Sequence, residues 1–281
     1  MVQYKQELTE MQKQNLKQLK DYCLLDDDFM TVVFQSTTCA SLLLQIILDK
    51  PDLEVVHVHT QDHFKNLQGR SAVLDIFAVD SKGNHYDCEV QRSDAGATTK
   101  RARYIGSLMD TNITEPGKNL EKLPNVYVIF ITENDVFEKN LPLYHFENTC
   151  LETQEAANDG RHTIFVNSQI QDETALGKLM HDFRCTKADD MNYSVLAQRV
   201  RYFKENEEGV TKMTKAMEER IKEAEAKAAA KAAAIAAAQA TFERALNDIK
   251  NVMKNTDSSA EKAMRILDIP ESDFSLYLSK L

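Results

Sequence analysis

The sequence predicts an α/β fold in which a mixed central sheet is flanked by helices, followed by a long Ala-rich helix and a small helical tail. Helix-type and strand-type patterns alternate over about the first 170 residues, an order typical of a sheet covered by helices. Residues 126–132 read VYVIFIT, a continuous run that is typical of a buried strand. Residues 218–253 are rich in Ala, Glu and Lys, which favour long helices.

The period of the apolar residues places the remaining elements. Helical spacing predicts one helix over 37–49, just before Pro51, and another over 97–110. Helices are expected again from Thr174 onward. Strand-type runs lie at 53–59, 72–79, 85–91, 126–132, 143–146 and 163–167.

We expect three parts along the chain: residues 1–204 as one α/β domain, 205–253 as a long exposed helix, and 254–281 as a small helical hairpin. The long helix lacks a regular heptad of bulky residues, so we interpret it as an arm or a weak surface for homo-oligomer formation. In the tail, Ser258 and Glu261 predict a capping box, and Pro270 predicts the first residue of a second helix.

Composition and charge narrow the class of protein. Hydrophobic residues make up 43% and charged residues 28%, which is ordinary for a soluble globular protein. The net charge of −10 argues against a strongly basic nucleic-acid coat, but it is compatible with a local basic groove. Five widely spaced cysteines without a CxxC pair favour a reduced, cytoplasmic location. Residues 1–18 show no signal-peptide pattern, and the apolar run at 39–48 is too short to span a bilayer, so no membrane partner is expected.

The hairpin at 74–91, LDIFAVDSKGNHYDCEVQ, places two carboxylates where apolar side chains are usual. Gly83 is suited to close a three-residue loop, because glycine readily adopts the left-handed conformation that such loops need. Counting back with alternating faces puts Asp75 directly opposite Glu89, and Gln91 follows on the same face.

Opposed carboxylates need a compensating charge. Like charges facing each other across strands are destabilising, and a buried carboxylate without a partner costs about several kcal/mol. Mg²⁺ is typically bound by one or two carboxylates with waters and phosphate oxygens. The pattern therefore predicts Mg²⁺, or another divalent cation, between Asp75 and Glu89. The alternative is a solvated acidic face, since a shift of register by one residue would separate the pair.

A basic cluster follows the hairpin directly. It consists of Arg92, Lys100, Arg101 and Arg103 near the start of the next predicted helix, with Tyr104 beside them. Such side chains contact the phosphates of nucleic acid, which would position DNA beside the proposed metal. A solvated helix face that pairs with acids elsewhere is an equally open interpretation.

Other kinds of site receive less support. His57 and His59 share one strand face with His63 close behind, but no cysteine or further histidine at ligand spacing supports zinc, so structural roles are expected. Cys88 points to the face opposite Glu89, which argues against a nucleophile at this site. The sequence contains no glycine-rich phosphate loop, serine-centred elbow or dinucleotide fingerprint.

The pattern of Asp75 followed by Glu89-Val90-Gln91 resembles the PD-(D/E)xK nuclease superfamily. The surrounding residues resemble its recombination-promoting nuclease, or putative transposase, family over about 25–204, through the stretches LDDDFMTVVFQ, ILDKPDL, KNLQGRSAVLDIFAVD, CEVQR, KRARYIGSLMD, NITEPG, LPNVYVIFITENDV and LGKLMHDFRCT. The resemblance implies a nuclease-like domain at 1–204 and metal-dependent cleavage of DNA, with Asp75 and Glu89 as metal ligands.

Two further roles depend on the resemblance. Where the superfamily name has lysine, this chain has Gln91, which would orient water or phosphate but lacks the charge that stabilises the transition state. A further acid of the family falls within 26–28, where we favour Asp27 and leave Asp26 and Asp28 open.

The leading hypothesis is a Mg²⁺-dependent DNA endonuclease from a bacterium or a mobile element. The uncharged Gln91 and the acidic net charge motivate one alternative, a non-catalytic DNA-binding or interaction protein on a degenerate nuclease fold. A scaffold built around the Ala-rich helix is a third hypothesis.

Overall fold

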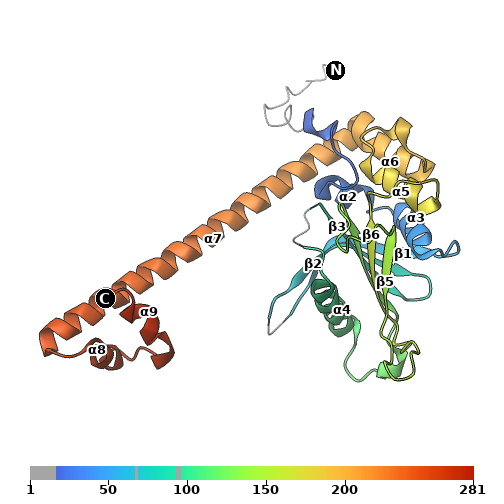
Figure 1. The fold of residues 1–281 in the computed structure, drawn as a ribbon. Coiled ribbons are helices and arrows are strands. Elements are labelled where there is room, and N and C mark those ends of the chain that lie inside the picture. Colours follow the sequence, from blue (N-terminus) through green and yellow to red (C-terminus); the bar gives the residue numbers. More distant parts are fainter. Residues whose placement is uncertain (1–16, 67–68, 93–95) are drawn as a thin grey trace, which may run out of the picture. The chain divides into compact units, whose positions relative to one another are not determined.

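The computed structural model describes residues 17–66, 69–92 and 96–281 (Figure 1). The chain divides into two compact units, Met1–Met217 and Glu218–Leu281. The first unit contains the sheet, and the second contains the greater part of the long helix with the C-terminal tail. Most of the N-terminal stretch that we expect to lack a signal peptide falls outside the described residues.

A mixed sheet of six strands forms the centre of the first unit, as predicted. The strand order is β1-β2-β3-β4-β6-β5. The neighbours β3 and β4, and β4 and β6, are parallel, whereas β1 with β2, β2 with β3, and β5 with β6 are antiparallel. The strands are β1 Val55–Phe64, β2 Ala72–Asp80, β3 His85–Gln91, β4 Val126–Thr132, β5 Leu143–Phe146 and β6 Arg161–Asn167. The predicted bounds of β3, β4 and β5 are confirmed, while β1 extends five residues further, to Phe64 instead of 59.

Polar side chains cap three helices of this unit. Ser36 caps α3 (Thr37–Leu48) by accepting a hydrogen bond from the Cys39 amide at 3.5 Å, and Thr98 caps α4 (Thr99–Ile113) through the Arg101 amide at 3.1 Å. Thr174 caps α5 in the same way. The other helices are α2 Asp27–Val33, α5 Ala175–Arg184 and α6 Ser194–Glu205.

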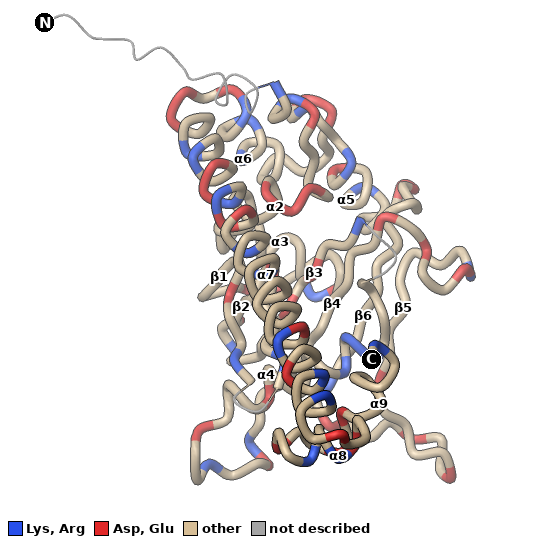
Figure 2. The backbone as a smooth tube through the Cα atoms, turned by 90° about the vertical axis from the view of Figure 1, so that its left-hand side faces the viewer, with Lys and Arg blue, Asp and Glu red and all other residues tan. Residues whose placement is uncertain are grey.

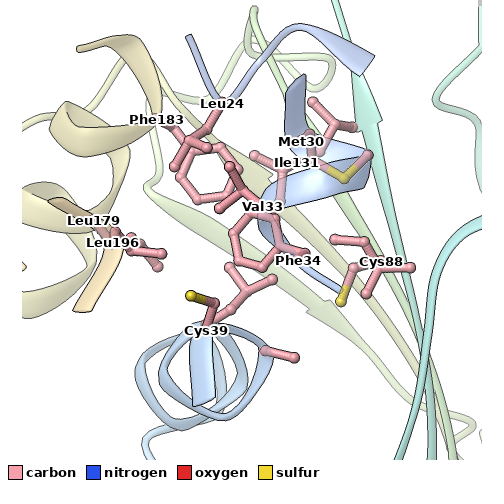
Figure 3. Close-up of a cluster of buried hydrophobic side chains, with 14 of the residues drawn as sticks. Leu24, Met30, Val33, Phe34, Cys39, Cys88, Ile131, Leu179, Phe183 and Leu196 are labelled. Carbon is pink, nitrogen blue, oxygen red and sulfur yellow. The ribbon is translucent and has the colours of Figure 1, made fainter. Parts of the chain in front are cut away.

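The two faces of the sheet have separate cores. Helices α2, α3, α5 and α6 pack on one face, where Figure 3 shows Phe34 beside Phe183, with Cys88 and Ile131 coming from the strands. Helix α4 packs on the other face, against a cluster that includes Phe130 of β4. Strand β4 is buried at every position. The continuous apolar run therefore marks a strand with helices on both sides, as expected.

The predicted long helix is α7 (Glu207–Thr256). Its first turns belong to the first unit, because Val210, Met213 and Met217 pack in that core. Residues 221–241 are exposed at every position. The predicted division of the chain at 204, and homo-oligomer formation through this helix, stay predictions.

The C-terminal tail is helical, as predicted, but its first cap is not where we expected it. Ser259, not Ser258, caps α8 (Ala260–Ile266) by accepting a hydrogen bond from the Lys262 amide at 3.3 Å. Pro270 precedes a short 3-10 turn before α9 (Phe274–Leu278). This prediction was wrong by one residue because two adjacent serines offer the same capping group, and local sequence alone does not choose between them.

Membrane association and the state of the cysteines bear on where the protein is located. Within the described part of the chain, no single helix is long and apolar enough to cross a membrane. Helices α2 and α3 reach that length and apolarity only when they are taken together, and the chain bends by 108° between them. The five cysteines carry free thiols. A cytoplasmic location and the lack of a membrane partner stay predictions.

Candidate active site

The β2–β3 hairpin has the predicted turn and register. Gly83 has φ +82°, and its amide donates to the Asp80 carbonyl at 3.0 Å. The ladder pairs Phe77 with Asp87. Its last pair is Ile76 with Cys88, so Asp75 and Glu89 follow directly beyond it on neighbouring antiparallel strands.

Asp75 is held by hydrogen bonds from two other elements. Its Oδ2 accepts from the Val90 amide at 3.3 Å, and its Oδ1 accepts from Gln61 Nε2 at 3.2 Å. The same Gln61 amide donates to Asp27 Oδ1 at 3.4 Å. Strand β1 therefore links the first residue of α2 to Asp75, and Asp27 joins the group that sequence analysis assembled.

Gln61 was missed by sequence analysis. Its φ of +56° lies in the left-handed region, which a residue other than glycine adopts at a cost of about 1–3 kcal/mol and which is found preferentially at functional sites. A lone glutamine in a strand gives no local signal for this conformation. Only the pairing of β1 with β2 brings it to Asp75.

The two carboxylates are perturbed in the direction expected for acids gathered in a buried place. Burial, followed by the charge of Asp27, raises the pKa of Asp75 to about 6. Burial, followed by the charge of Asp75, raises the pKa of Glu89 to about 8. Arg101 acts on both carboxyls in the opposite direction and lowers the pKa. Arg101 therefore offsets only part of the cost of ionising these two buried carboxyls.

Arg101 pairs with one oxygen of Glu89. Its Nη2 contacts Glu89 Oε2, its Nη1 donates to the Gly96 carbonyl at 3.4 Å, and the guanidinium lies 5.5 Å from the centre of the Phe130 ring. Glu89 is fully buried, and its other oxygen, Oε1, accepts no hydrogen bond. An orphaned buried carboxylate oxygen fits a cation ligand, because such an atom otherwise bears the full cost of lost hydration.

Gln91 lies beside Arg101 at a glycine. A Cβ atom on Gly96 would lie 2.2 Å from Gln91 Oε1 and 2.9 Å from Arg101 Nη1. Both side chains therefore use the space that this glycine leaves open. Sequence analysis did not single out Gly96, although a glycine just before a helix is a usable signal of close approach.

Asp87 is a further acid that sequence analysis did not place in the site. It lies two residues before Glu89 on β3, is fully buried, and neither of its carboxylate oxygens accepts a hydrogen bond. Burial, followed by the charges of Glu89 and Asp75, raises its pKa well above the ordinary value. Burial beside two other acids therefore favours the protonated form of Asp87 more than in an exposed aspartate.

The other predicted residues occupy different surroundings. Arg92 forms ion pairs with Asp26 and with Glu133, the latter at 3.2 Å, so Asp26 belongs to this pairing while Asp27 faces Gln61. Asp28 lies in the first turn of α2. Lys100 and Arg103 are exposed on α4. Phosphate binding by the four basic residues stays a prediction.

A groove of about 910 Å³ opens beside Arg101, and Lys100, Arg101 and Tyr104 of α4 form part of its wall. Other lining residues come from the segment between β1 and β2, which includes Arg70, and from the first residues of β2. Tyr104 is held there, since its hydroxyl donates to the Arg70 carbonyl. Over the chain as a whole, acidic and basic residues are interspersed (Figure 2). The basic side chains of the groove, Arg70, Lys100 and Arg101, are therefore a local feature, which the acidic net charge left open.

The chain belongs to a family described as PD-(D/E)XK nuclease family transposases, and the model of that family matches residues 39–258. The match includes Asp75, Glu89, Gln91 and Arg101, whereas Asp27 lies before it. No curated protein and no solved structure gives a significant match. Membership supports a function of the nuclease or transposase type. It indicates that the protein is a hydrolase acting on nucleic acid, and the family implies that the substrate is DNA. Nucleases of this kind generally use divalent metal ions.

Proposed function

We propose that the protein is a metal-dependent DNA endonuclease that hydrolyses phosphodiester bonds at Asp75 and Glu89. The observation that carries the proposal is the orphaned, fully buried Oε1 of Glu89 beside a second carboxylate whose pKa is also raised. A cytoplasmic location in a bacterium, or in a cell that hosts a mobile element, is part of the same proposal.

Asp75 and Glu89 would hold the cation, and Asp27 would contribute through its position beside Gln61. Hard divalent cations prefer carboxylate oxygens, which makes Mg²⁺ the ion expected here. When bound, such an ion lowers the pKa of a water molecule and neutralises phosphate charge.

The remaining residues orient the reacting groups. Gln61 and the Val90 amide fix the two oxygens of Asp75. Arg101 contacts Glu89 and also lines the basic groove, so one side chain joins the carboxylate pair to the surface where a DNA backbone would lie. Gln91, whose side chain lies beside Gly96, would donate a hydrogen bond from its amide nitrogen to water or phosphate.

A non-catalytic DNA-binding protein is the second candidate. Arg101 already contacts Glu89, and Gln91 carries no charge, so the site could hold DNA without the cationic assistance that cleavage uses. The same groove would then serve binding alone.

Cleavage of closed circular DNA separates these functions, because a circle has no ends for an exonuclease. The full chain with Mg²⁺ should nick supercoiled plasmid, and excess chelator should stop it. Glu89→Gln should lose the activity, whereas Asp52→Asn, a matched change at an exposed acid in the turn before β1, should retain it. DNA binding by wild type without any nicking, over a range of divalent cations, would favour the second candidate.

A further inference from the structure

A second cluster of ligating side chains lies where β5 meets β6. His145 is in β5, Glu147 follows the end of that strand, and His162 is the second residue of β6. The register pairs His145 with Ile164, which makes His162 its diagonal neighbour on the same face. Ile164 belongs to the core under α3 and α5, so this is the face opposite the one that Phe130 shares with α4.

The three ligand atoms form a compact triangle. His145 Nε2 lies 3.1 Å from His162 Nδ1 and 3.3 Å from Glu147 Oε1, and His162 Nδ1 lies 2.8 Å from the same oxygen. Zinc bonds of about 2.0–2.1 Å in a tetrahedron place neighbouring ligand atoms about 3.3 Å apart. The triangle therefore has close to the dimensions of one face of a zinc coordination tetrahedron.

Hydrogen bonds alone satisfy these three ligand atoms poorly. If both ring nitrogens carry hydrogen, two N–H groups face each other across 3.1 Å. If only one ring nitrogen carries a hydrogen, the other presents a lone pair. That lone pair faces either the Glu147 oxygen, which as part of an ionised carboxylate can only accept, or an N–H group that already donates to Glu147. A cation accepts all three lone pairs at once.

The surroundings hold the ligands in place. The His162 ring stacks on Tyr127 with centroids 4.3 Å apart and planes within 9°, and Tyr127 stacks on Tyr86 in turn. An open cavity of about 240 Å³ borders Glu147 and His162. Its size leaves room for a water molecule as a fourth ligand.

We propose that His145, Glu147 and His162 bind a divalent cation of the zinc type, with a fourth position open to water. Two imidazoles and one carboxylate suit Zn²⁺, whereas an all-oxygen pair suits Mg²⁺. A bound ion would tie β5 to β6 and stabilise the folded state by mass action. The histidines of β1 that sequence analysis weighed for zinc, His57, His59 and His63, are not part of this cluster.

Zinc binding is tested by titrating Zn²⁺ alone into the metal-free full chain by calorimetry. The chain used carries Asp75→Asn and the buffer contains excess Mg²⁺, so that Asp75 and Glu89 do not contribute to the binding of Zn²⁺. We expect one ion per chain and a rise in melting temperature. His145→Gln, Glu147→Gln and His162→Gln should each weaken binding at least about tenfold. His63→Gln, a matched change at an exposed histidine, should bind like its parent.

Co²⁺ in place of Zn²⁺ gives a second readout that does not depend on a variant. The parent chain should show the intense visible absorption of tetrahedral cobalt, and added Zn²⁺ should remove it. Absence of stoichiometric Zn²⁺ binding, an octahedral Co²⁺ spectrum, or equal affinity in His63→Gln and the three cluster variants would overturn the proposal.

Discussion

The sheet carries two groups of ionisable side chains that differ in donor atoms, burial and position. Asp75 and Glu89 offer oxygen alone, and Glu89 is fully buried beside the core under α4. His145 and Glu147 are exposed, His162 is partly buried, and the three combine nitrogen with oxygen on the other face. The contrast teaches that donor type, oxygen alone or nitrogen with oxygen, distinguishes the cations that the two groups would suit.

Exchange of one carboxylate for its amide in each group should give the largest effects, and each exchange should remove the response of the melting temperature to a different ion. Glu89→Gln should abolish the rise in melting temperature caused by Mg²⁺ while leaving the rise caused by Zn²⁺. Glu147→Gln should do the reverse, because each change removes the charge from one group only. Thermal unfolding in both ions measures this, and equal loss of both responses in either variant would break the comparison.

Truncation tests whether the long helix belongs to the active unit. A chain that ends after Met217 keeps the buried side chains of Met213 and Met217 and should still nick DNA. A chain that ends after Glu205 loses both, at about 2–5 kcal/mol for each buried methionine, and should fold poorly. Urea unfolding and nicking assays compare the two. Complete loss of cleavage by a well-folded 1–217 chain would show that the remainder of α7 completes the site.

The hairpin turn and register were predictable because they depend on local rules. Alternation of side chains and the left-handed Gly83 fix the pairing that leads to Asp75 and Glu89. Gln61 was not predictable in the same way, because its role arises from strand pairing and an unusual φ.

Burial is a second limit on what the sequence predicts, as Asp87 shows. Its position opposite Phe77 follows from the register, but its complete burial depends on packing beneath α4, which the local pattern does not reveal. His145 and His162 show a third limit. They meet only because β5 pairs with β6, whereas sequence analysis considered the histidines that are close together in the chain.

The acid pair should make the metal-free protein less stable as pH rises. The pKa of Glu89 is about 8 when folded against an ordinary value of 4.5, and Asp75 shifts in the same direction. Between these pH values the native state binds more protons than the unfolded state, so stability is fully present below about pH 4.5 and declines towards pH 8.

The slope due to one such group is at most about 1.4 kcal/mol per pH unit. Urea unfolding from pH 5 to 8 should show a flatter dependence in Glu89→Gln than in wild type. Added Mg²⁺ should flatten the wild-type curve, since the ion favours the ionised carboxylates. An identical slope in wild type and Glu89→Gln would contradict a raised pKa at this residue.

Gly96→Ala should have the smallest effect. The new methyl group would displace the Gln91 amide and crowd Arg101, so we expect about a tenfold loss of cleavage, equal to about 1.4 kcal/mol in the barrier. Stability should change little, because Gln91 is a flexible side chain that is only partly buried. Single-turnover kinetics with a melting curve checks both, and unchanged cleavage would remove Gln91 from the mechanism.

The most direct test of the account is Asp75→Asn, assayed for nicking of supercoiled DNA and for melting temperature without metal. The account predicts that Mg²⁺-dependent nicking is lost while metal-free stability stays equal or rises, since removing one charge relieves repulsion of about 0.2–1 kcal/mol. A structural acid would instead lose about 3–5 kcal/mol of stability when its buried partner is left unpaired. That loss, or cleavage at the wild-type rate, would contradict the assignment of Asp75 as a metal ligand.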